Sequence, residues 1–157
     1  MRDIVFRAKV KKSVRPTLGE ILPDGTWVYG ELHATARVPH IHNTPCSSQP
    51  IDTETIGQYT GLTDKNGKKI FEGDIVAFTF YSDLAEHARL EERPEITENY
   101  VILFHDGSFW MNRIVVPDSL TAQLYGRRVV LESLWKHRVE VIGNIHDNPD
   151  LLNRVMK

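Results

Sequence analysis

Hydrophobic and polar positions alternate with a period of two at the start of the chain. In residues 4–9 (IVFRAK), Ile4, Phe6 and Ala8 occupy one set of alternating positions, and the other set includes Arg7 and Lys9. This alternation is typical of a half-buried strand, because a helix repeats its apolar positions every three to four residues. Residues 23–25 (Pro-Asp-Gly) then predict a turn before the strand-favouring run at 26–29. The two runs are expected to form an N-terminal hairpin.

Two dipeptides predict further hairpins. Asn66-Gly67 follows the strand-like run at 55–60, and it is the pair preferred at the two φ > 0 positions of a type I′ turn. Asp106-Gly107 separates the apolar run at 100–104 from residues 108–111 (SFWM). Each dipeptide should join two strands that pair locally.

Two further apolar runs predict strands, and the end of the chain predicts a helix. Residues 75–81 (IVAFTFY) are apolar on both alternating sets, which favours a central strand covered on both faces. Residues 139–145 predict a last strand. Residues 148–150 (Asn-Pro-Asp) then supply a capping residue, an N1 proline and a first-turn acid. We expect a short C-terminal helix that docks through Leu151 and Leu152.

Two segments are less regular. Residues 38–52 hold three prolines and little apolar periodicity, and they are expected to form a long surface connection. The chain is accordingly predicted as one domain, 1–157, that can divide into lobes at 1–50 and 51–157. Residues 83–93 are strongly charged and end before Pro94, which fits a short helix or an irregular excursion.

These elements predict a mainly β fold with small barrel-like sheets built from hairpins, a short C-terminal helix and one further short helix near 83–93. The length of 157 residues and the 41% hydrophobic content are enough for one domain or two small lobes with modest cores.

Four segments carry a resemblance to a known family. They are residues 2–8 (RDIVFRA), 25–30 (GTWVYG), 55–76 (TIGQYTGLTDKNGKKIFEGDIV) and 141–152 (VIGNIHDNPDLL). In this order they resemble the YopX family, whose members are encoded mostly by phages and prophages. The resemblance implies a β-rich fold and supplies neither an activity nor a set of functional residues. The chain departs from the family pattern after Ala8 and again at 38–50.

Composition narrows the classes of function. A net charge of −2 and a pI near 6.4 argue against a protein whose overall charge attracts it to nucleic acid or to an anionic membrane. Cys46 is the only cysteine, so no intrachain disulfide can form and a reducing compartment is favoured. No stretch has the length and hydropathy of a membrane span or a signal peptide. We expect a cytoplasmic protein without membrane contact.

A group of metal-ligating residue types lies within fourteen positions: His33, His40, His42 and Cys46. Imidazole and thiolate are the ligands that zinc prefers. The spacing does not match a structural zinc motif, and an exposed polar loop is the competing interpretation. A metal-dependent enzyme built on these histidines remains one hypothesis.

Other catalytic patterns are weak. His105-Asp106 and His146-Asp147 are His-Asp neighbours, but adjacent side chains on a strand point to opposite faces. No G-x-S-x-G pattern surrounds a serine, and the glycines are spaced for β turns rather than for a phosphate loop. We therefore expect no cofactor, and these patterns favour a non-catalytic protein over an enzyme.

Three short basic segments suggest an alternative, a nucleic-acid-binding β-barrel module. Cationic loops beside aromatic side chains can follow a phosphate backbone and stack bases. The residues of these segments are Lys65, Lys68, Lys69, Arg127, Arg128, Lys136 and Arg138. Ordinary solvated surface charge is the competing interpretation.

The sequence thus predicts a phage-type accessory protein that binds or self-assembles without catalysis. A homo-oligomer and a protein partner are the expected contacts, since small β folds often pair their exposed edges. Nucleic-acid binding and metal-dependent catalysis are the alternatives.

Overall fold

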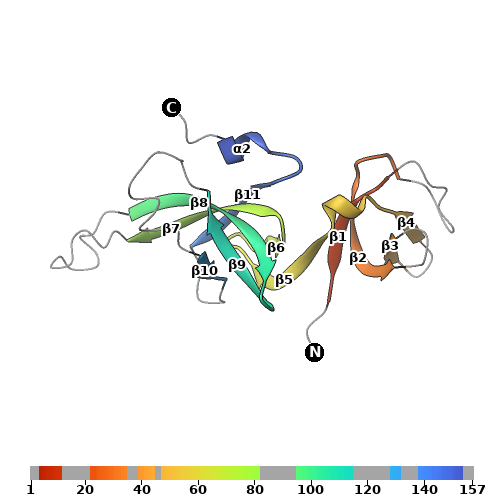
Figure 1. The fold of residues 1–157 in the computed structure, drawn as a ribbon, viewed down its shortest axis with the longest axis horizontal. Coiled ribbons are helices and arrows are strands. Elements are labelled where there is room, and N and C mark those ends of the chain that lie inside the picture. Colours follow the sequence, from red (N-terminus) through yellow and green to blue (C-terminus); the bar gives the residue numbers. More distant parts are fainter. Residues whose placement is uncertain are drawn as a thin grey trace. The chain divides into compact units, whose positions relative to one another are not determined.

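The computed structural model describes residues 4–11, 22–34, 39–44, 47–81, 95–114, 128–131 and 138–153. Within these ranges the chain is almost entirely β, which confirms the predicted fold class (Figure 1). The strands are β1 (Phe6–Lys9), β2 (Trp27–Ala34), β3 (Pro39–Thr44), β4 (Ser47–Pro50), β5 (Gly57–Thr63), β6 (Lys69–Phe71), β7 (Asp74–Tyr81), β8 (Glu95–His105), β9 (Ser108–Arg113), β10 (Arg128–Val130) and β11 (Val139–Asn144). The helices are the 3-10 turn η1 (Thr53–Thr55) and α2 (Asp150–Asn153).

The chain forms two compact units, residues 1–61 and 62–157. The strands build a six-stranded sheet of order β4-β3-β2-β1-β5-β6 and a five-stranded sheet of order β10-β9-β8-β7-β11. Both sheets are open rather than closed into barrels. The second helix expected near 83–93 lies outside the described residues, and no helix of the described part is long and apolar enough to span a membrane.

The strands of the first unit bury an apolar cluster. β1 and β2 pair antiparallel with Ala8 opposite Val28, so the predicted N-terminal hairpin is confirmed. The turn residue Gly25 has φ of 78°, and the Thr26 amide donates to the Pro23 carbonyl over 3.1 Å. The cluster comprises Ala8, Val10, Val28, Ile41 and Ile51.

The prediction of a surface connection at 38–52 is wrong. Residues 39–44 and 47–50 are strands, and Ile41 and Gln49 are fully buried. The prolines fit because Pro39 begins β3 and Pro50 ends β4, the edge strand of the sheet, where a missing N–H is tolerated. The burial comes from contacts with segments distant in sequence, which periodicity does not report.

The hairpin around Asn66-Gly67 is confirmed, but the turn type is not. Only Gly67 has φ > 0, at 81°, whereas a type I′ turn needs both central residues there. The Gly67 amide donates to the Asp64 carbonyl over 3.0 Å, and the Asp64 amide donates to the Lys68 carbonyl over 2.8 Å. The turn is therefore centred one residue earlier, and Gly67 follows it in the left-handed conformation.

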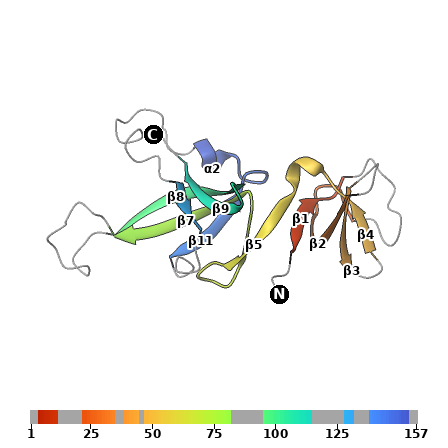
Figure 2. The same ribbon diagram turned by 60° about the horizontal axis from the view of Figure 1, so that its bottom comes forward.

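The hairpin between β8 and β9 has the predicted turn. Asp106 and Gly107 have φ values of 51° and 77°, as a type I′ turn requires. β7 lies inside the five-stranded sheet between β8 and β11, in agreement with the prediction for 75–81 (Figure 2). The core of this unit comprises Ile70, Val76, Phe78, Tyr100, Ile102, Met111, Leu131, Val139 and Val141.

The chain's described end is packed over β11. The short helix α2 confirms the predicted C-terminal helix, but only one of its leucines docks: Leu152 remains 36% exposed. A Cβ built on Gly143 would lie 2.5 Å from Asn148 Oδ1 and 3.0 Å from Leu151 Cδ1. Only glycine leaves room for this close approach.

Candidate functional site

The tip of the β5–β6 hairpin is bonded to the start of β11, more than 70 residues away in sequence. The Lys65 amide donates to the Val139 carbonyl over 2.9 Å. The Lys65 ammonium pairs with the Glu140 carboxylate at 2.6 Å, and the Asn66 amide group donates to the same carboxylate over 3.5 Å. Two of the predicted basic segments, the hairpin tip and the segment ending at Arg138, are thereby brought together.

Asp64 holds this junction in place. Its buried carboxylate accepts from the backbone N–H groups of Asn66, Lys68 and Val141 over 2.8, 2.9 and 3.0 Å. Burial by itself would raise the pKa of Asp64. The three backbone hydrogen bonds and the charge of Lys68 outweigh burial and lower the pKa below its ordinary value. The carboxylate is thus ionised at neutral pH and links the hairpin to β11.

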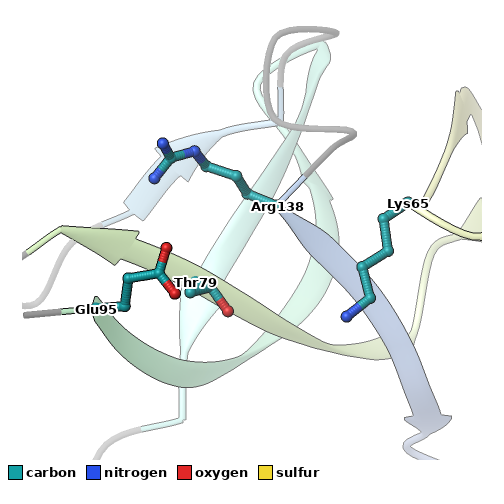
Figure 3. A pocket seen from close by; sticks show the side chains of 4 residues that line it. All are labelled: Lys65, Thr79, Glu95 and Arg138. Carbon is teal, nitrogen blue, oxygen red and sulfur yellow. The ribbon is translucent and has the colours of Figure 1, made fainter. Parts of the chain in front are cut away.

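A shallow hollow of about 400 Å³ lies next to this junction, on the solvent-facing side of the five-stranded sheet. Lys65, Thr79, Glu95 and Arg138 line it, and Figure 3 shows Glu95 beside Thr79, with the two cations coming from other segments. Thr79 lies opposite Thr97, and Tyr81 lies opposite Glu95, so these four side chains share one face of the β7–β8 pair. The hollow therefore combines two cations, one hydroxyl group and one carboxylate.

Arg138 is held against an aromatic ring at the rim of the hollow. Its guanidinium carbon lies 4.6 Å from the centroid of the Tyr81 ring. This cation–π contact restrains the Arg138 side chain. It uses the face of the planar guanidinium, so N–H groups at the edge of the plane can still donate to an acceptor. The arrangement fits recognition of an oxyanion such as a phosphate group.

The other described residues of the predicted basic surface lie on the hairpin tip and on β10. Lys68 and Lys69 are exposed on the same hairpin tip as Lys65. Arg128 lies on β10, at the other edge of the five-stranded sheet from β11. Arg127 and Lys136 lie outside the described residues. We name Lys65, Lys68, Lys69 and Arg138 the cationic edge.

The predicted histidine group lies on β2 and β3, where it shares one face with Glu31. Glu31 is opposite His42 and His33 is opposite His40, so all four side chains lie on the same side of the strand pair. The rings of His33 and His42 have centroids 4.3 Å apart, and His33 Nε2 lies 3.5 Å from Glu31 Oε2. His40 is 92% buried, and Cys46 lies outside the described residues.

These histidines are therefore on strands rather than on the exposed loop that the sequence suggested. Within the described ranges, no group of three or more His, Cys, Asp or Glu side chains has the arrangement needed to hold a metal ion. The pair His33 and His42 is nevertheless in direct ring contact on an exposed surface.

The two His-Asp neighbours have simple structural surroundings. His105 Nδ1 and Asp106 Oδ2 are 2.7 Å apart, with side chains 56% and 78% exposed, at the tip of the β8–β9 hairpin. The Asp147 carboxylate accepts from the side-chain amide of Asn144 over 2.7 Å. Solvent surrounds the first pair, and the second aspartate belongs to the loop that leads into α2.

Sequence reasoning missed the carboxylates of both surfaces. Glu31 precedes His33 by two residues, and a spacing of two on a strand would have placed it on the same face. No local sequence pattern predicts the positions of Glu140 and Glu95. Tertiary pairing alone brings Glu140 to Lys65 and Glu95 to Thr79.

The comparisons with known proteins cover both units. A family model described as YopX protein matches residues 29–153. The chain belongs to the YopX family. The YopX match runs from β2 to the end of α2 and includes the cationic edge, His33 and His42.

A solved structure is also similar, the crystal structure of protein EF1440 from Enterococcus faecalis. It is 26% identical, and the similarity covers 78% of this chain and 74% of that chain with a TM-score of 0.37. No curated protein matches the chain.

Proposed function

We propose that this YopX-family protein works by binding rather than by catalysis, and that its ligand is the phosphate backbone of nucleic acid. The observation that carries the proposal is the junction of the β5–β6 hairpin with the start of β11. This junction collects Lys65, Lys68, Lys69 and Arg138 from segments about 70 residues apart. Cations gathered at one edge can contact successive phosphates, although the net charge of the whole chain is −2.

Carboxylates near the cationic edge limit the expected affinity for nucleic acid. The ammonium of Lys65 is already paired with Glu140, and Glu95 lies in the adjacent hollow. A phosphate must therefore compete with carboxylates for part of the cationic edge. We expect weak binding that depends strongly on salt, in the range of sequence-independent contacts, for which Kd is about 10⁻⁴ to 10⁻⁶ M.

Self-association and a protein partner remain the other proposals for this chain. The large apolar side chains that are exposed in the described residues lie on separate elements rather than in one strip. They are Ile4, Tyr29, Phe104, Ile142 and Leu152. A phosphate-binding edge is therefore the function that the described surface supports best.

A titration with single-stranded DNA, double-stranded DNA and single-stranded RNA over a range of salt concentrations tests the proposal. We expect binding that weakens as salt rises. Lys68→Gln combined with Lys69→Gln should weaken it about tenfold at low salt, and should lower the salt slope by about one to two units. Lys9→Gln combined with Lys11→Gln makes the same change of charge in the other unit and should have little effect.

A second variant gives an effect of opposite sign. Glu140→Gln removes the carboxylate that pairs with Lys65 and leaves that ammonium for phosphate. We expect binding to become about threefold tighter, as Coulomb attraction near a protein surface allows. No salt-sensitive binding to any of the three nucleic acids, or an equal loss in both double variants, would overturn the proposal. A multimer found by sizing together with blank titrations would favour self-association.

A further inference from the structure

We infer that His33 and His42 form a binding site for a divalent transition-metal ion of the Zn²⁺, Ni²⁺ or Cu²⁺ class, with Glu31 beside them. This two-histidine clamp lies on the first unit and is independent of the proposed nucleic-acid edge on the second. It also differs from the zinc-type loop expected from the sequence, because its ligands lie on paired strands and Cys46 is not needed.

The register of β2 and β3 places the two imidazoles side by side. His33 faces His40 and Glu31 faces His42, so His33 and His42 are diagonal neighbours on one face of the pair. Their ring centroids are 4.3 Å apart with the ring planes tilted by 41°. Metal–nitrogen bonds of about 2.0–2.1 Å place the centroids of two rings on one ion roughly 4.5–5 Å apart. The centroid separation of 4.3 Å lies just below this range.

The surroundings supply the rest of a coordination shell. His33 Nε2 lies 3.5 Å from the carboxylate of Glu31, whose side chain is 80% exposed. This carboxylate can accept from the N–H of the metal-bound imidazole, and such a hydrogen bond strengthens a histidine site. His33 and His42 are both exposed, so water can fill the open positions.

A third imidazole stands next to the clamp. His40 lies opposite His33 on the same face and is 92% buried. Within the described residues its Nε2 has no hydrogen-bond partner, although burying a polar atom without one is unfavourable. His40 does not complete a three-ligand site with His33 and His42, because no three such side chains of the described residues are arranged to hold a metal ion. The site is therefore a two-histidine site.

Metal titration of the untagged full-length protein by calorimetry tests the inference, with NiCl₂ and ZnCl₂ as the probes. We expect about one equivalent of metal to bind, and Cu²⁺ electron paramagnetic resonance should show coupling to imidazole nitrogen. His33→Gln and His42→Gln should each weaken binding at least tenfold. His105→Gln is the matched control, because His105 is similarly exposed beside a carboxylate but has no second histidine described next to it. This variant should bind as the wild type does.

Two further measurements, of Tm with metal and of metal binding by Cys46→Ser, can refute the inference. Metal should raise the Tm of the wild type and of His105→Gln, and should leave the Tm of His33→Gln unchanged. Binding should persist in Cys46→Ser, since the clamp uses no thiolate. Loss of binding in Cys46→Ser, equal binding in all three histidine variants, or no bound metal in the wild type would overturn it. A circular dichroism spectrum of each variant distinguishes a lost ligand from a lost fold.

Discussion

Replacing Asp64 tests the link between the β5–β6 hairpin and β11. Its carboxylate accepts three backbone N–H groups, two from its own turn and one from Val141, which lies 77 residues further along the chain. Asp64→Asn keeps the size of the side chain, but it removes the charge and turns one acceptor into a donor. The variant therefore isolates the hydrogen bonding of this junction from its packing.

The expected loss of stability follows from the burial of each bond. The bond from the Val141 amide is buried, so that amide loses its partner without access to water, at a cost of about 1–3 kcal/mol. The amides of Asn66 and Lys68 both donate to Oδ1, and the amide oxygen of the variant can still accept from them; losing the charge weakens the two bonds by about 1 kcal/mol together. We expect the free energy of unfolding of the second unit to fall by roughly 2–4 kcal/mol at pH 7.

The effect should depend on pH in a defined direction. Because the pKa of Asp64 is lowered in the folded state, the folded protein binds fewer protons at this group than the unfolded chain does. The stabilisation is fully present above the unfolded pKa of about 3.9 and is lost as the pH falls through the lower folded value. The difference between wild type and variant should therefore be constant above about pH 5 and should shrink below about pH 4.

Urea unfolding and amide hydrogen exchange measure the two parts of this prediction. Exchange of the Val141 and Lys68 amides should accelerate by about 100-fold or more in the variant, as expected for a loss near 3 kcal/mol. Asp106→Asn is the matched control, because that side chain is 78% exposed at another hairpin turn. A loss below about 0.5 kcal/mol for Asp64→Asn, or equal losses for both variants, would refute the reasoning.

The remaining predictions concern two glycines. Gly143→Ala should lower the free energy of unfolding by about 1–3 kcal/mol, because the new Cβ would lie 2.5 Å from Asn148 Oδ1. Its neighbour Ile142 is 38% exposed, and Ile142→Ala should cost less; thermal unfolding compares the two. Gly107→Ala should cost about 1 kcal/mol through backbone strain alone, since φ is 77° and no atom lies within 4 Å of the new Cβ. A cost below about 0.3 kcal/mol in urea unfolding would contradict that origin.

The local sequence predicted the hairpins well because a turn depends on a few adjacent residues. Asp106-Gly107 adopts φ > 0 at both positions, and Gly25 does so after Pro23, as their residue types indicate. The turn at Asn66-Gly67 differs from the type that its dipeptide favours. There the carboxylate of Asp64 accepts from the amides of Asn66 and Lys68, and these side-chain contacts stabilise a different turn from the one that the dipeptide alone favours.

The error at 38–52 has a different origin. Few residues of β3 and β4 are strongly apolar, yet Gln49 and Ser48 are buried. The amide of Leu22 donates to the Gln49 side chain over 3.3 Å, so a polar residue can occupy the interior once a distant partner satisfies it. Buried polar residues of this kind look solvent-facing in the hydrophobic pattern, so the pattern does not predict these strands.

Sequence alone determined the β character of this protein, the positions of its hairpins, its YopX resemblance and the residue types of both candidate surfaces. Alternation and turn chemistry are properties of neighbouring residues, so they can be read without coordinates. Tertiary structure decided which of those residues meet. Strand pairing placed His33 beside His42, and the buried carboxylate of Asp64 brought Lys65 close to Arg138. Such contacts depend on register and on hydrogen bonds between distant segments, which no local pattern encodes.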